Sequence, residues 1–84
     1  MSKKDKLLIS VISGKQDKNI LFTDLCNLLD IIGLDSRISS SHHIYYKENI
    51  IEILNLQPDG KLAKPYQVKQ VREFILKYGL GGKK

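Results

Sequence analysis

The chain has 84 residues and a net charge of +5, with 42% hydrophobic and 27% charged residues. This length allows one small domain with a single hydrophobic core, and the composition is that of a globular chain rather than a disordered one. The single cysteine, Cys26, excludes an intramolecular disulfide and favours a reducing, cytoplasmic compartment. The apolar runs are too short to span a bilayer, and no signal-peptide core follows the N-terminal lysines.

The first third of the chain predicts two helices. Residues 1–13 carry apolar side chains at helical spacing, and Gly14 ends the segment before a polar connector over residues 15–19. We expect Thr23 to cap a second helix that stops at Gly33, with Leu34 packing back on Leu29 as in the common glycine C-cap. Cys26 lies on the apolar side of this helix and is expected to be a core residue.

After Gly33 the pattern changes to strands. Residues 34–40 and 42–47 are rich in Ile, Ser and Tyr, and residues 50–57 are a strongly strand-like run. The links between the three segments are short, which predicts an antiparallel meander. Residues 58–60, Pro-Asp-Gly, indicate a turn. The order helix, helix, three strands, helix predicts an α+β fold with the helices on one face of a three-stranded antiparallel sheet.

The last helix is predicted to begin at Pro65, because a first-turn position needs no N–H. Its apolar stripe is Val68, Val71, Ile75 and Tyr78. Glu73 and Lys77 are spaced for an i,i+4 ion pair, and Gly79-Leu80 repeats the stop signal of the second helix.

The positive charge gathers at the C-terminal end. Residues 61–84 hold seven Lys and Arg against Glu73 alone, whereas residues 21–60 are net negative. Such clustering favours a polyanionic partner. The alternative is a set of solvated helix faces followed by a basic tail, residues 81–84, which we expect to be disordered.

Two adjacent histidines, His42 and His43, are the side chains best suited to proton transfer near neutral pH. Neighbours on a strand point to opposite faces, so the two cannot serve one substrate alike, and no third partner completes a metal site. Parity sorts the strand into His42, Ile44 and Tyr46 on one face and His43, Tyr45 and Lys47 on the other. From this pattern alone we expect His42 on the apolar side and His43 on the wet side. A hydrogen-bonded structural histidine is the alternative for either.

A second stretch, residues 56–68, joins a turn to the start of the last helix. It brings Lys61 and Lys64 to the helix N-terminus, whose free backbone N–H groups also favour anions. With the ring of Tyr66, these side chains form a candidate grip on a phosphate backbone. An ordinary polar loop is the alternative.

Together these segments resemble the HicA-type toxins of bacterial and archaeal toxin–antitoxin systems. The resemblance covers roughly residues 20–80 and is carried by Gly33-Leu34, Arg37, the run Ser40-Ser41-His42-His43-Ile44-Tyr45, the blocks 56–60 and 64–72, and Tyr78-Gly79-Leu80. Residues 1–19 then correspond to the N-terminal helical extension of a longer subgroup, and residues 81–84 to the tail.

The resemblance implies a fold like that of double-stranded-RNA-binding domains. It also implies an endoribonuclease that cleaves mRNA without a metal or cofactor and is masked by a HicB-type antitoxin. The family motif is Gly-Ser-His with a catalytic histidine, which maps onto His42, with Ser41 matching the serine and His43 kept as the fallback. Ser40 stands in place of the motif glycine and lacks that residue's easy access to positive φ. The Val-Pro-x-His segment of many shorter relatives is absent.

In this interpretation His42 is the general base, and three cationic side chains, Arg37, Lys61 and Lys64, hold phosphates. Ser41 and Tyr66 also contact the RNA, and Tyr45 stacks on a base or forms a hydrogen bond. Two other functions fit the same pattern: an RNA-binding module without catalysis, and an interaction protein whose open sheet face docks a partner.

Overall fold

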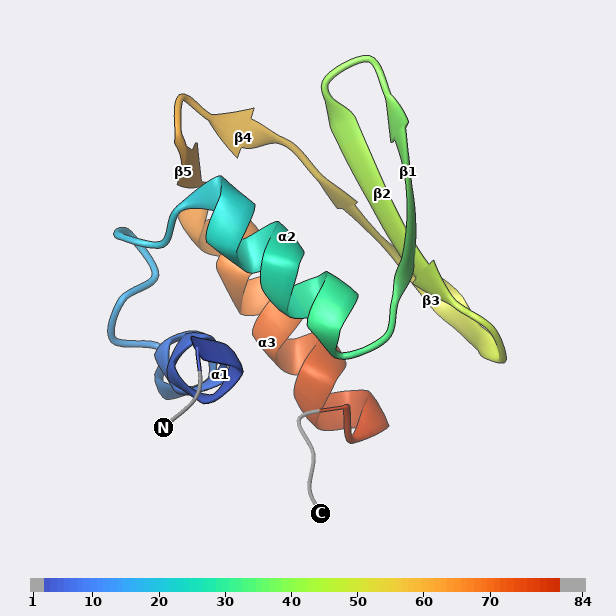
Figure 1. Ribbon diagram of the computed structural model, residues 1–84, viewed down its shortest axis with the longest axis horizontal. Helices are drawn as coiled ribbons and strands as arrows, with labels where there is room; N and C mark the ends of the chain where they lie inside the picture. The colour runs from blue at the N-terminus through green and yellow to red at the C-terminus, as the bar shows by residue number, and fades with distance from the viewer. Residues whose placement is uncertain (1–2, 81–84) are drawn as a thin grey trace.

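The computed structural model describes residues 3–80, in which two helices are followed by the strands and then by a last helix (Figure 1). The elements in chain order are α1 (Lys3–Ser13), α2 (Phe22–Ile31), β1 (Asp35–Ser39), β2 (His42–Lys47), β3 (Ile50–Leu56), β4 (Pro58–Asp59), β5 (Leu62–Ala63) and α3 (Pro65–Tyr78). This order confirms the predicted α+β class and its α-α-β-β-β-α layout. The expected tail, residues 81–84, lies outside the described residues. No helix within residues 3–80 is long and apolar enough to cross a membrane.

The main sheet has the predicted antiparallel order β1-β2-β3. A two-residue turn, Ser40-Ser41, connects β1 to β2, and Ser39 pairs with His42 at its base. Ser40 has a φ of 58°, so it takes the left-handed conformation that a glycine would adopt most easily. The tight hairpin imposes this conformation, at a local cost of roughly 1–2 kcal/mol.

The C-terminal end of α2 follows the predicted glycine cap. Gly33 has a φ of 102°, its N–H donates to Asp30 O at 3.1 Å, and the N–H of Leu34 donates to Leu29 O at 3.1 Å. The predicted N-cap is wrong. The helix begins at Phe22 with Leu21 as N-cap and no side-chain hydrogen bond, so Thr23 lies inside the first turn. Backbone pairing supplies the start instead, because the N–H of Phe22 donates to Lys61 O at 3.0 Å.

A small hairpin of β4 and β5 lies before α3, and its turn is at residues 60–61, because Pro58 and Asp59 of the predicted turn form β4. It docks on the chain just ahead of α2, where the N–H of Ala63 donates to Ile20 O at 2.8 Å and Leu21 forms a β-bridge with Leu62. Strands of two residues are too short to show alternation, so sequence periodicity does not reveal them. The hairpin fixes where Lys61 and the start of α3 lie relative to α2.

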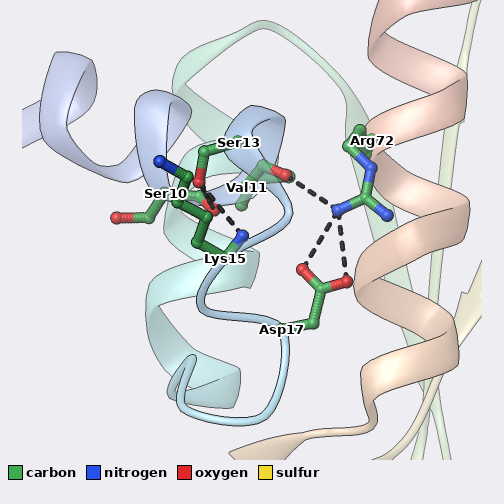
Figure 2. A network of polar contacts seen from close by, with 6 residues as sticks. All are labelled: Ser10, Val11, Ser13, Lys15, Asp17 and Arg72. Atoms are coloured by element: carbon green, nitrogen blue, oxygen red, sulfur yellow. Dashed lines mark hydrogen bonds and ion pairs between the residues drawn. The ribbon is translucent and has the colours of Figure 1, made fainter.

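α1 shares the core of the rest of the chain. Val11 is 1% exposed and packs in the same cluster as the buried side chains of α2, β3 and α3. Arg72 of α3 adds a polar tie, shown in Figure 2: its Nη1 donates to Val11 O at 3.2 Å and to Asp17 Oδ1 at 3.0 Å. The N-terminal segment is therefore part of the folded unit.

α2 and α3 cover one face of the main sheet, α1 packs against these two helices, and the other face of the sheet is open (Figure 1). Leu54 and Leu56 of β3 point into the core, whereas Ile51 is fully exposed and Ile53 is 54% exposed. Tyr46 of β2 and Arg37 of β1 are exposed as well. We call this side, made of residues 35, 37, 39, 42, 44, 46, 51, 53 and 55, the open sheet face.

Candidate functional site

His42 begins β2 and lies exposed on the open sheet face. Its Nδ1 is 3.0 Å from Oδ1 of Asn55, which is near the end of β3 on the same face. An amide oxygen only accepts hydrogen bonds, so in a neutral ring this hydrogen bond requires the proton to be on Nδ1. The second nitrogen, Nε2, is thereby left with a lone pair that can accept a proton.

The parity interpretation of β2 was wrong about which face is the core. Tyr45 is 3% exposed and belongs to the core, and the ring of His43 packs edge-on against Phe22 with the centroids 4.8 Å apart. Lys47 shares this side and donates from Nζ to Gly33 O at 3.3 Å. Tyrosine can bury its ring and lysine its aliphatic stem while the polar end of each keeps a hydrogen-bond partner. A sequence pattern that counts these residues as polar therefore assigns a buried face to solvent.

This geometry separates the two histidines. His42 points away from the helices, whereas His43 is half-buried between the sheet and α2. The fallback His43 therefore cannot contact a substrate on the open sheet face, and His42 is the histidine that can.

Tyr45 cannot stack on an RNA base as predicted, because its side chain is enclosed in the core. Its hydroxyl interacts with the side chain of Cys26, and burial raises the pKa of both groups above their ordinary values. Cys26 is half-buried and fits the expected role of a core residue. The exposed tyrosine of β2 is Tyr46, on the open sheet face.

A chain of hydrogen bonds links the β1–β2 turn to α3. The side chain of Gln57 donates from Nε2 to Ser41 Oγ at 3.0 Å, and its backbone N–H donates to Gln67 Oε1 at 3.0 Å. Gln67 Nε2 in turn donates to the backbone oxygen of Asn55 at 3.4 Å and lies 3.5 Å from the hydroxyl of Tyr66. We call Ser41, His42, Asn55, Gln57, Tyr66 and Gln67 the polar cluster.

The prediction therefore named three members of the polar cluster, Ser41, His42 and Tyr66, and missed the three amides. Gln67 carried a detectable signal, because it precedes Val71 by four positions on the buried face of α3 and is itself only 5% exposed. A polar residue at a core position of a helix indicates a specific hydrogen-bonding role. Asn55 and Gln57 interrupt the apolar end of β3, which is a weaker signal.

The predicted cationic residues lie outside the polar cluster. Arg37 is on the open sheet face, where it lines a shallow hollow with Ile44, Tyr46 and Ile53. Lys61 is exposed in the β4–β5 turn, and Lys64 is the N-cap residue of α3. In Figure 1 this hairpin and the β1–β2 turn lie toward the same end of the molecule.

Two other cationic side chains of the C-terminal segment form ion pairs with acidic residues. Arg72 pairs with Asp17, and Lys77 pairs with Glu52 of β3 at 3.3 Å rather than with Glu73 as predicted. The cations left near the start of α3 are Lys61, Lys64 and Lys69. The positively charged surface near α3 is therefore smaller than the number of Lys and Arg residues in this part of the sequence indicates.

Among residues 3–80, no group of three or more His, Cys, Asp or Glu side chains is placed to hold a metal ion. Comparison of the chain with protein-family models, with curated proteins and with solved structures finds no match.

Proposed function

We propose that this protein is an endoribonuclease in which His42 is the general base. The observation that carries the proposal is the exposed ring of His42, whose Nδ1 is held by Asn55 so that Nε2 faces solvent as a proton acceptor. A base in this state suits cleavage of RNA, whose 2′-hydroxyl is an internal nucleophile next to each phosphate.

The reaction proceeds by transfer within the substrate. His42 Nε2 takes the proton of a 2′-hydroxyl, the 2′ oxygen bonds to the adjacent phosphorus, and the bond from phosphorus to the 5′ oxygen breaks. The 5′ oxygen leaves and is protonated, and His42 gives the proton it took back to solvent, so the products are a 2′,3′-cyclic phosphate and a 5′-hydroxyl end. Arg37, Lys61 and Lys64 bind phosphates, and Ser41 and Tyr66 contact the RNA.

In the same proposal the protein is the toxin of a toxin–antitoxin pair and acts on mRNA in the cytoplasm. It requires no metal or cofactor, and a HicB-type antitoxin covers the site. The resemblance of residues 20–80 to HicA-type toxins supports this assignment. The exposed isoleucines of the open sheet face, Ile51 and Ile53, also support it, because they provide apolar surface for a protein partner on the same sheet face as His42.

The test is cleavage of a defined mRNA by the purified full chain, with and without EDTA. We expect fragments ending in 2′,3′-cyclic phosphate and a loss of at least about 100-fold in rate for His42→Ala. A matched control, Lys6→Gln, removes an exposed charge on α1, which carries no residue of the proposed site, and should cleave like the wild type. A His42→Ala protein that cleaves at the wild-type rate would contradict the assignment.

A growth test addresses the cellular part. Expression of the wild type should arrest cells, His42→Ala should not, and co-expression of a neighbouring antitoxin gene should restore growth. If instead the protein binds RNA with strong salt dependence and never cuts it, the non-catalytic RNA-binding module is the correct function.

A further inference from the structure

The contact between His42 and Asn55 determines more than the placement of one ring. A neutral histidine has two tautomers, and the hydrogen-bond partner of one nitrogen decides which is populated. Oδ1 of Asn55 lies 3.0 Å from Nδ1 of His42, a normal distance for a hydrogen bond between N–H and a carbonyl oxygen. The contact therefore favours the Nδ1–H tautomer, whereas imidazole side chains in water favour Nε2–H.

The backbone of Asn55 is fixed by two other elements, β2 and α3. Its backbone pairs with Ile44 of β2, and its backbone oxygen accepts a hydrogen bond from Gln67, an almost fully buried residue of α3. The side-chain oxygen of Gln67, Oε1, accepts a hydrogen bond from the backbone N–H of Gln57. The strand carrying Asn55 is thus fixed to both the sheet and α3, so the amide sits on a rigid support.

We propose that Asn55 is a positioning residue that selects the Nδ1–H tautomer of His42, so that Nε2 is the atom that takes the proton. The inference rests on the proposed ribonuclease function for its kinetic consequence but not for the tautomer itself. Asparagine performs this role without a charge, so it orients the imidazole without adding the strong attraction that a carboxylate would exert on an imidazolium.

The first experiment reads the tautomer directly by long-range ¹H–¹⁵N NMR of the histidine rings in the full chain. The chain has two histidines, so the His42→Ala spectrum assigns them. We expect Nδ1–H for His42 in the wild type and in Asn55→Asp, which keeps an acceptor oxygen. In Asn55→Ala the Nε2–H form should dominate. Asn27→Ala, an exposed change on α2, should leave the spectrum of His42 unchanged.

The second experiment measures RNA cleavage by the same variants. Asn55→Ala should lower kcat by about 10- to 100-fold, the range typical for loss of a group that orients a functional histidine, with little change in KM. Asn55→Asp should recover a substantial part of kcat. A merely structural role would instead lower the thermal stability of both variants together and leave the tautomer unchanged.

The outcomes separate the two proposals. An Nε2–H wild type, or an Asn55→Ala protein that keeps Nδ1–H or the wild-type kcat, overturns the role of Asn55. A wild type that does not cleave RNA overturns the proposed function and the kinetic role of Asn55, while the NMR result still decides whether Asn55 selects the tautomer.

Discussion

At the scale of single residues, the site depends on one buried glutamine. Gln67 is on the core side of α3, yet it contacts the N–H of Gln57, the backbone oxygen of Asn55 and the hydroxyl of Tyr66. Among the described residues, no buried side-chain nitrogen or oxygen is left without a hydrogen-bond partner. At the end of β3, the amide of Gln67 provides the partners for the backbone of Asn55 and Gln57. The exposed histidine is thus supported by a polar group that lies inside the molecule.

Replacing this glutamine should be costly. Gln67→Leu keeps a side chain of similar size but removes the acceptor of the N–H of Gln57. We therefore expect the free energy of unfolding to fall by about 1–3 kcal/mol. Urea unfolding followed by circular dichroism measures this change. Gln67→Glu keeps an acceptor oxygen and serves as the matched variant. Equal stability of Gln67→Leu and the wild type would show that water replaces the glutamine.

At the scale of elements, two ion pairs connect α3 to the rest of the fold in different environments. The Arg72–Asp17 pair is mostly shielded, with side-chain exposures of 18% and 22%, and it joins α3 to the connector before α2 (Figure 2). The Lys77–Glu52 pair joins α3 to β3 and is largely exposed, at 65% and 46%. Shielding strengthens the first pair and screening weakens the second.

The first pair should therefore matter for stability. Arg72→Ala removes hydrogen bonds to both Asp17 and Val11 O, and we expect a loss of about 1–3 kcal/mol in the free energy of unfolding. A double-mutant cycle with Asp17→Asn separates the ion pair from the bond to the backbone. Lys77→Ala, the exposed counterpart, should have a clearly smaller effect. A zero coupling energy between Arg72 and Asp17 would contradict this prediction.

The second pair should make stability depend on pH. The hydroxyl of Tyr78 and the ammonium of Lys77 hold the pKa of Glu52 below its ordinary value. A carboxyl with a lowered folded-state pKa stabilises the protein above its unfolded pKa, about 4.3, and loses that contribution as the pH falls through the folded value.

Glu52→Gln is the variant that isolates this contribution. The stability difference between wild type and Glu52→Gln should be present at pH 7 and shrink toward zero by about pH 3, as thermal unfolding across that range would report. A difference that stays constant from pH 7 to pH 3 would show that the charge of Glu52 contributes nothing.

At the scale of the whole molecule, folding redistributes the positive charge of the sequence. Arg72 and Lys77 are neutralised by acids from the connector before α2 and from β3, which leaves Lys61, Lys64 and Lys69 as the cations near the start of α3. That position adds the free N–H groups of a helix N-terminus to the lysine charges. RNA binding should therefore depend on a few lysines rather than on net charge.

This surface can be tested by the salt dependence of RNA binding. In a His42→Ala background, which prevents cleavage, the double change Lys61→Gln and Lys64→Gln should reduce the slope of log K against log salt by about 0.7 per lost contact with single-stranded RNA. The control, Lys4→Gln with Lys6→Gln, removes the same charge from α1 and should keep the slope. Equal slopes for the two double variants would exclude the lysine surface.

The sequence was sufficient for the features that depend on local chemistry. Gly33 and Gly79 end their helices because only a residue without a Cβ enters the left-handed region at little cost, and both have positive φ. The three strands of the main sheet and the start of α3 at Pro65 follow from equally local signals, namely residue type, short links and the missing N–H of proline.

Other features were decided by contacts between distant segments. Backbone pairing with the β4–β5 hairpin starts α2 in place of Thr23, and packing against α2 turns Tyr45 and His43 inward. The pairing of β2 with β3 brings Asn55 to His42, thirteen residues apart in the chain. The sequence alone determined that His42 is a candidate base on a small α+β domain. Only the tertiary structure decided which face it occupies and which nitrogen is free, because both depend on partners that alternation and spacing do not encode.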